Sequence, residues 1–217
     1  MRRSAIACAH GETKKVEIPT DICYNNITYN SSEDSMDLTE KKIEEISRYS
    51  GILMDVRVDR VELPGGKQSK REIAEHPEGV TILPLDKNGD VYCVRQYRYA
   101  FSTDILEIPA GKLEPGEEPM AAAVRELGEE TGIIAERIDP LGAFMMSPGF
   151  CTEVLHIYLA RELHFGIAHP DEDELLNVEK YSLQTLLDMV MRGDICDAKS
   201  AIAILKTARF LEKEAER

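Results

Sequence analysis

The densest group of chemically active side chains lies in residues 111–133, GKLEPGEEPMAAAVRELGEETGI, which contain six glutamates and one arginine. Glu126 and Glu130 are four residues apart, so they share one face of any helix formed here, and Glu129 lies at the edge of that face. Arg125 precedes Glu129 by four and can brace it with a charge-assisted hydrogen bond. The carboxylates repel one another and the helix dipole. A divalent cation such as Mg²⁺ or Mn²⁺, which prefers oxygen ligands, would stabilise the cluster, whereas the simpler interpretation is a solvated charged face.

A helix must position these carboxylates. Pro119 fits its first turn, where a missing N–H costs little, and Gly132 can end it in the left-handed conformation. Between these two, an apolar stripe at helical spacing is expected to face the core: Met120, Ala123, Val124 and Leu127.

The flanking sequence predicts a sheet covered by helices on both sides, and hence an α/β fold. Alternating residues predict strands at 52–63 and 69–76, and Asn88-Gly89 predicts a hairpin between two further strands. More strands are expected near 105–111, 138–146 and 153–161. Two closing helices are expected to start at the caps Ser182 and Asp197.

Length and charge limit the function. The chain has 217 residues and a net charge of −14, a surface that repels nucleic acid. The same charge would repel a phosphate ligand unless local arginines and cations reverse the field. No apolar run is long enough to cross a bilayer, and the five scattered cysteines suit a reducing compartment, so we expect a cytoplasmic protein without membrane or nucleic-acid partners.

Three segments follow from these patterns. Residues 1–35 are polar and aperiodic, and we interpret them as a flexible N-terminal extension. Residues 36–78 carry N-terminal strands that are expected to form an antiparallel β subdomain. Residues 79–217 are expected to form the domain that carries the glutamate cluster.

The glutamate segment resembles the signature of the Nudix hydrolases, which is G, five residues, E, seven residues, then R-E-aliphatic-x-E-E-x-G-aliphatic. Every position is matched, and the seven fixed residues would coincide by chance with a probability on the order of 10⁻⁹. The resemblance implies an α/β/α sandwich with a mixed sheet. It also implies that Glu126, Glu130 and the carbonyl of Ala110 bind Mg²⁺ (or Mn²⁺), with Glu129 as a secondary or catalytic carboxylate. Glu117 and Arg125 would be scaffold, and Gly111 would let the loop turn tightly onto the helix.

Other segments resemble one group within this family, the ADP-ribose pyrophosphatases. In VRQYR, Arg98 would contact the diphosphate, and in KREIAEH, Arg71 would reach into the site of a neighbouring subunit. In SPGFCTE, Pro148 and Glu153 would contact substrate. The acidic loop DEDELL, 171–176, would supply a base or a further metal ligand, Glu174 by position or else Glu172. Each segment also has a simpler interpretation, as strand-edge charges, a turn or a solvated loop.

These resemblances imply Mg²⁺-dependent hydrolysis of ADP-ribose to AMP and ribose 5-phosphate by a homodimer. Two alternatives stay open: a pyrophosphatase for another nucleoside diphosphate sugar, such as GDP-mannose or ADP-glucose, and a non-catalytic ADP-ribose sensor. The chain has no Trp, so the residue that stacks on the base is undecided among Tyr49, Tyr97 and Tyr99.

Overall fold

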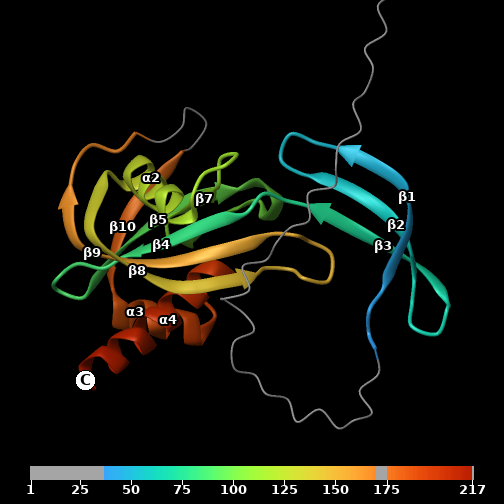
Figure 1. The fold of residues 1–217 in the computed structure, drawn as a ribbon. Helices are drawn as coiled ribbons and strands as arrows, with labels where there is room; N and C mark the ends of the chain where they lie inside the picture. The colour runs from blue at the N-terminus through green and yellow to red at the C-terminus, as the bar shows by residue number, and fades with distance from the viewer. Residues whose placement is uncertain (1–36, 170–174, 217) are drawn as a thin grey trace, which may run out of the picture.

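The computed structural model describes residues 37–169 and 175–216, which form three sheets and three helices (Figure 1). An N-terminal sheet has the order β1-β2-β3, a second sheet has the order β10-β5-β6, and a four-stranded sheet has the order β7-β4-β9-β8. The strands are β1 Lys41–Ser50, β2 Asp55–Glu62, β3 Gln68–Glu75, β4 Gly79–Pro84, β5 Asp90–Arg98, β6 Thr103–Glu107, β7 Ala110–Lys112, β8 Ile133–Met145, β9 Val154–Phe165 and β10 Leu176–Ser182. The helices are α2 Pro119–Thr131, α3 Leu183–Arg192 and α4 Ala198–Ala215, and a short 3₁₀ turn covers Tyr99–Phe101.

The four-stranded sheet forms the centre of the molecule, with a helix layer on each face. Strands β4 and β9 are parallel, whereas β7 and β8 run antiparallel to their neighbours, so the sheet is mixed. Val80 and Ile82 of β4 pack with α2, whereas Leu83 joins the cluster of α3 and α4. This alternation buries both faces of β4, and the α/β/α sandwich expected from the sequence is confirmed.

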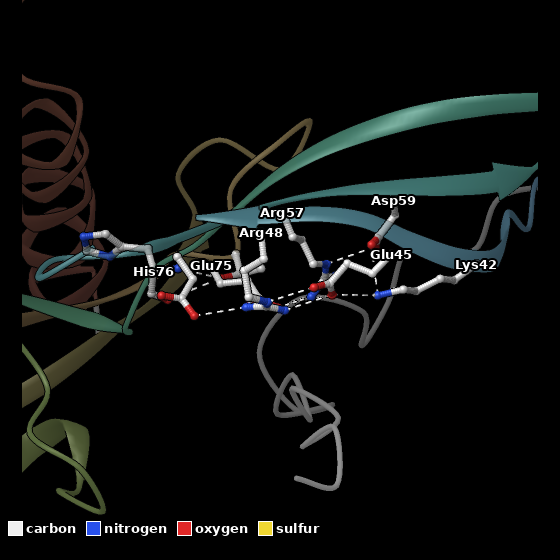
Figure 2. A network of polar contacts seen from close by, with 9 residues as sticks. Lys42, Glu45, Arg48, Arg57, Asp59, Glu75 and His76 are labelled. Atoms are coloured by element: carbon white, nitrogen blue, oxygen red, sulfur yellow. Dashed lines mark hydrogen bonds and ion pairs between the residues drawn. The ribbon is translucent and has the colours of Figure 1, made fainter. Parts of the chain in front are cut away.

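The N-terminal sheet lies beside the sandwich and is crossed by a ladder of charges (Figure 2). Arg48 of β1 bonds to Glu45, at 2.9 Å, and to Glu75 of β3, at 2.6 Å. Asp59 of β2 is only 2% exposed and lies 2.9 Å from both Lys42 and Arg57. The pairs connect all three antiparallel strands, so complementary charge helps to define their register.

Strand β1 was not predicted by the alternation that begins at Gly51. All ten of its residues are exposed, and two register shifts interrupt its pairing with β2, after Lys42 and after Glu45. Because β1 has no buried face and its pairing is interrupted, its sequence does not alternate between apolar and polar residues as a half-buried strand would.

The hairpin at Asn88-Gly89 is only partly right. Gly89 has a φ of 83° and donates its N–H to the carbonyl of Asp86, so the turn forms. The strands pair at a single bridge, Leu85 with Val91, and then enter different sheets. The residues Asn88 and Gly89 were enough to predict that the chain turns here. The strands that pair with β4 and β5 belong to other parts of the chain, so the local pattern at the turn did not predict them.

The expected apolar stripe of α2 is wrong at two positions. Met120 and Val124 are 53% and 44% exposed. The buried residues are Ala122, Ala123, Glu126, Leu127 and Glu130. The buried face of α2 therefore includes Glu126 and Glu130, which lie against the loop before the helix. The larger apolar side chains Met120 and Val124 lie outside this face.

The helix ends match the sequence prediction. Pro119 is the first residue of α2, and Gly132 ends it with a φ of 69°. Ser182 and Asp197 accept hydrogen bonds from the backbone of Thr185 and Ser200, capping α3 and α4. None of the described helices is long and apolar enough to span a bilayer.

Candidate active site

The centre of the site is the contact between α2 and the loop that contains Ala110 and Gly111. Glu130 is 1% exposed, and its Oε2 accepts a hydrogen bond from the Ala110 N–H at 3.2 Å. Glu126, 8% exposed, lies so close to Gly111 that any side chain there would collide with its carboxylate. Gly111 does not have a positive φ, so close approach rather than a tight turn requires glycine.

Arg125 holds the other carboxylates in place. Its Nη1 donates to Glu126 Oε1 and Glu129 Oε2, both at 2.9 Å, so the predicted brace between Arg125 and Glu129 is present. Its Nε and Nη2 donate to the two oxygens of Glu117, again at 2.9 Å, and Nη2 also reaches the Lys112 carbonyl. The hydrogen bond from Arg125 lowers the pKa of Glu117 to about 2. One guanidinium thus fixes three glutamates and the loop.

The donor set suits a hard divalent cation. Two largely buried carboxylates lie against the loop backbone, Glu130 at Ala110 and Glu126 at Gly111. Carboxylate and carbonyl oxygens are the ligands that Mg²⁺ and Mn²⁺ prefer. Within the described residues, no three His, Cys, Asp or Glu side chains are already gathered as a ligand set, and Arg125 occupies one oxygen each of Glu126 and Glu129. The second oxygens of these two carboxylates are not engaged by Arg125.

A pocket of about 430 Å³ opens beside these carboxylates. Its lining includes Gly111, Arg125, Glu126 and Glu129 from the glutamate segment, and Ile52 and Leu53 from the β1–β2 connection. A larger cavity, about 780 Å³, lies elsewhere, between the β4–β5 turn and the end of β9. None of the predicted site residues that the structure describes lines the larger cavity, so we assign the site to the smaller pocket.

Arg98 is placed near the carboxylates but is already paired. Its Nε and Nη2 each donate to Glu107 at 2.6 Å. The hydrogen bond to Glu107 raises the pKa of Arg98, and the charges of Glu107, Asp197 and Glu130 act in the same direction. The charge of Glu130 therefore acts on Arg98, whose hydrogen bonds go to Glu107.

Glu153 also lies beside the loop. A methyl group on Gly79 would be 3.8 Å from Glu153 Oε1 and 3.2 Å from the Gly111 carbonyl oxygen. His76, at the end of the charge ladder in Figure 2, lies 3.8 Å from Glu153. The segment that contains Glu153 is tied to β3 by the hydrogen bond from Ala74 N–H to the Phe150 carbonyl. The N-terminal sheet therefore positions this part of the site.

No contact with the carboxylates is seen for the other predicted site residues that the structure describes. Pro148 is exposed, and Arg71 bonds to Glu40 on the N-terminal sheet, at 2.5 and 2.9 Å. Glu172 and Glu174 lie outside the described residues. The three tyrosines considered for base stacking, Tyr49, Tyr97 and Tyr99, are all more than half exposed.

Sequence reasoning missed Glu107, which binds Arg98, and Lys199, which contacts Glu107. A signal was present for Glu107, because a carboxylate sits between apolar neighbours in the strand segment DILEIPAG. No comparable signal marks Lys199, which is one of several lysines on an amphipathic helix.

A mixed sheet between two helix layers, with buried glutamates pressed against a glycine loop, has the fold and donor set of a hydrolase for phosphate compounds. Residues 75–199 match the NUDIX domain family, so the chain belongs to the Nudix family and is a Nudix hydrolase. Nudix hydrolases generally use divalent metal cations.

Two relatives cover most of the chain. An ADP-ribose pyrophosphatase of Bacillus subtilis (strain 168) is 44% identical over 169 residues, 77% of this chain and 91% of the relative. The methanol dehydrogenase activator of Bacillus methanolicus is 41% identical over 167 residues, 76% of this chain and 90% of the relative. A solved structure, of an ADP compounds hydrolase, aligns with a TM-score of 0.75 at 24% identity, covering 83% of this chain and 98% of the other, and it supports the fold.

Proposed function

We propose that the protein hydrolyses the diphosphate of ADP-ribose to AMP and ribose 5-phosphate with Mg²⁺. The single observation that carries the proposal is the complete glutamate signature, in which Glu130 and Glu126 lie against Ala110 and Gly111. The likeness to an ADP-ribose pyrophosphatase along 91% of that relative favours ADP-ribose among diphosphates.

Each residue has a distinct role in the proposed reaction. Glu126, Glu130 and the Ala110 carbonyl would hold the cations, with Glu129 as a further carboxylate. When bound, the cations neutralise phosphate oxygens and lower the pKa of water. Arg98 would donate to the diphosphate, and Glu153 and Pro148 would contact the remainder of the substrate.

The proton of the attacking water needs an acceptor. Glu174 is our first candidate and Glu172 the second, both from the acidic loop outside the described residues. Water adds to one phosphorus, the P–O bond to the bridging oxygen breaks, and the carboxylate takes the proton. The intact glutamate set argues against the non-catalytic sensor.

A substrate panel tests the proposal. ADP-ribose, ADP-glucose, GDP-mannose and a nucleoside triphosphate are compared at equal Mg²⁺, with products separated by chromatography. We expect ADP-ribose to have the highest kcat/KM, because groups that hydrogen-bond a terminal ribose reject analogues that leave them unpaired. A roughly tenfold preference for GDP-mannose or ADP-glucose would assign a different sugar nucleotide, and turnover that survives EDTA would refute the metal chemistry.

A further inference from the structure

Glu107 is a buried carboxylate shared by two cations. Its side chain is 2% exposed, and it ends β6, just before the loop of Ala110 and Gly111. Arg98 of β5 binds it through two hydrogen bonds of 2.6 Å, and Lys199 of α4 approaches to 2.5 Å. A buried charge is costly unless it is paired, so this carboxylate depends on both partners.

The first turn of α4 fixes this arrangement. Asp197 caps the helix, accepting from the Ser200 N–H at 3.0 Å and from its hydroxyl at 2.5 Å. The Ser200 oxygen in turn accepts from the Ile108 N–H at 2.8 Å, and Asp197 also lies 3.0 Å from Lys199. The start of α4 therefore contacts the side chain of Glu107 through Lys199 and the backbone N–H of Ile108 through Ser200.

The geometry leaves part of Arg98 available for a ligand. Nε and Nη2 are used by Glu107, while Nη1 makes no hydrogen bond to any residue that the structure describes. The side chain of Arg98 is 40% exposed, and the negative charge of Glu130 is one of the causes that raise its pKa. A bidentate pair fixes the plane of a guanidinium, so the direction of Nη1 is fixed as well.

Lys199 also changes the charge that Arg98 presents. A carboxylate bonded to Arg98 alone would neutralise most of its positive charge. Lys199 lies against both Glu107 and Asp197, so the two cations and two carboxylates of this group balance, whereas without Lys199 the group would carry a net charge of −1 beside a site crowded with glutamates. An anionic diphosphate therefore meets a more favourable potential with Lys199 present than it would without it.

We propose that Glu107 and Lys199 are positioning residues, which orient Arg98 toward the substrate's diphosphate and preserve its attraction for that anion. This inference rests on the proposed function, in which Arg98 contacts the diphosphate. A purely structural interpretation, in which Lys199 only fastens α4 to β6, predicts a loss of thermal stability without a specific loss of binding.

The experiment combines Lys199→Met, which removes the charge at similar length, with Lys199→Arg, which restores it. Lys206→Met on the exposed side of the same helix is the matched control. For each variant we would measure kcat and KM for ADP-ribose with Mg²⁺, and Tm. The Kd for a non-hydrolysable analogue, α,β-methylene ADP-ribose, would be measured by calorimetry.

We expect Lys199→Met to raise KM and Kd about tenfold, the effect of one weakened charge-assisted contact, with a smaller change in kcat. Lys199→Arg should recover most of the affinity, and Lys206→Met should resemble the wild type. In an Arg98→Met background, Lys199→Met should have little further effect on Kd, because the two residues act as a unit.

Two results would overturn the inference separately from the function. If the wild type hydrolyses ADP-ribose but Lys199→Met binds the analogue like Lys206→Met, the positioning role is wrong and the enzyme assignment stands. The positioning role is also wrong if the effects of Lys199→Met and Arg98→Met on the free energy of binding simply add. It is wrong as well if Lys199→Met lowers Tm without changing Kd. If the wild type neither binds the analogue nor turns over ADP-ribose, the proposed function fails and this inference fails with it.

Discussion

Arg125 and Glu130 show how single residues create this site. Arg125 links Glu117, Glu126 and Glu129 through hydrogen bonds of 2.9 Å, so a cluster that would otherwise repel itself is held together. Glu130, in contrast, is almost fully buried, beside the backbone N–H of Ala110. The arginine thus offsets the repulsion among the carboxylates, and we propose the buried glutamates as the ligands of a cation.

Glu130→Gln removes a charge without changing volume. We expect kcat to fall by several orders of magnitude, with Tm close to the wild type, and Mn²⁺ affinity to fall in a calorimetric titration without substrate. Glu118→Gln, an exposed glutamate next to the same helix, is the matched control and should preserve both. Undiminished Mn²⁺ binding by Glu130→Gln would remove this residue from the ligand set.

Glu117 should make stability depend on pH. Its pKa in the folded protein is lowered from 4.5 to about 2, chiefly by the hydrogen bond from Arg125. A depressed pKa contributes stability that is present above the unfolded value and is lost as the pH falls through the folded value. Glu117→Gln should therefore lower Tm at about pH 7 and lower it much less at about pH 3.

Glu114→Gln changes an exposed glutamate in the same loop and serves as the control for that comparison. Its Tm difference from the wild type should be small at both pH values. A Tm difference for Glu117→Gln that stays constant between them would show that the ion pair with Arg125 does not contribute through its charge.

Among the secondary-structure elements, α2 both packs on the four-stranded sheet and positions the glutamates. It packs Ala122, Ala123 and Leu127 on the four-stranded sheet, and it also turns Glu126 and Glu130 inward. Small alanines let the helix approach the sheet closely, which brings the carboxylates into contact with the glycine loop. The same rotation leaves Met120 and Val124 in solvent.

A pair of truncations tests which face of α2 is buried. Leu127→Ala, at a position 1% exposed, should lower the free energy of unfolding by about 2–5 kcal/mol, because it leaves a cavity. Met120→Ala, at a position 53% exposed, should change it by less than about 0.5 kcal/mol. Urea unfolding measures both changes, and equal losses would contradict the orientation of the helix.

At the scale of the whole molecule, the N-terminal sheet stands beside the sandwich and reaches it in two places (Figure 1). The β1–β2 connection lines the pocket, and the end of β3 pairs with the segment before Glu153. Arg71 is instead paired with Glu40 on the sheet itself. We propose that residues 36–78 form a dimerisation subdomain and that Arg71 serves the site of the partner chain.

Complementation tests that proposal. Arg71→Ala and Glu130→Gln should each be nearly inactive as homodimers. After unfolding and refolding together, half of the dimers should be mixed, and each mixed dimer should have one complete site, which restores about a quarter of wild-type activity. If Arg71 serves its own chain, the mixture stays inactive. An active monomer in light scattering would exclude the dimer.

Residue spacing along the chain was enough to predict the hydrolase family and the ends of the helices. The spacing of Glu126 and Glu130 indicated a shared helix face, and Pro119, Gly132, Ser182 and Asp197 specified where helices begin or end. These features depend on contacts within one or two helical turns. Local spacing therefore contains the information needed to predict them.

The partners of these residues, in contrast, depend on long-range packing. In the folded protein, α2 buries Glu130 and leaves Val124 exposed, and β4 and β5 belong to different sheets. Position 111 must be glycine because the carboxylate of Glu126 lies against it. Folding also brings Lys199 to Glu107, 92 residues away. Such contacts depend on the packing of distant strands and helices, and the spacing of residues along the chain does not encode them.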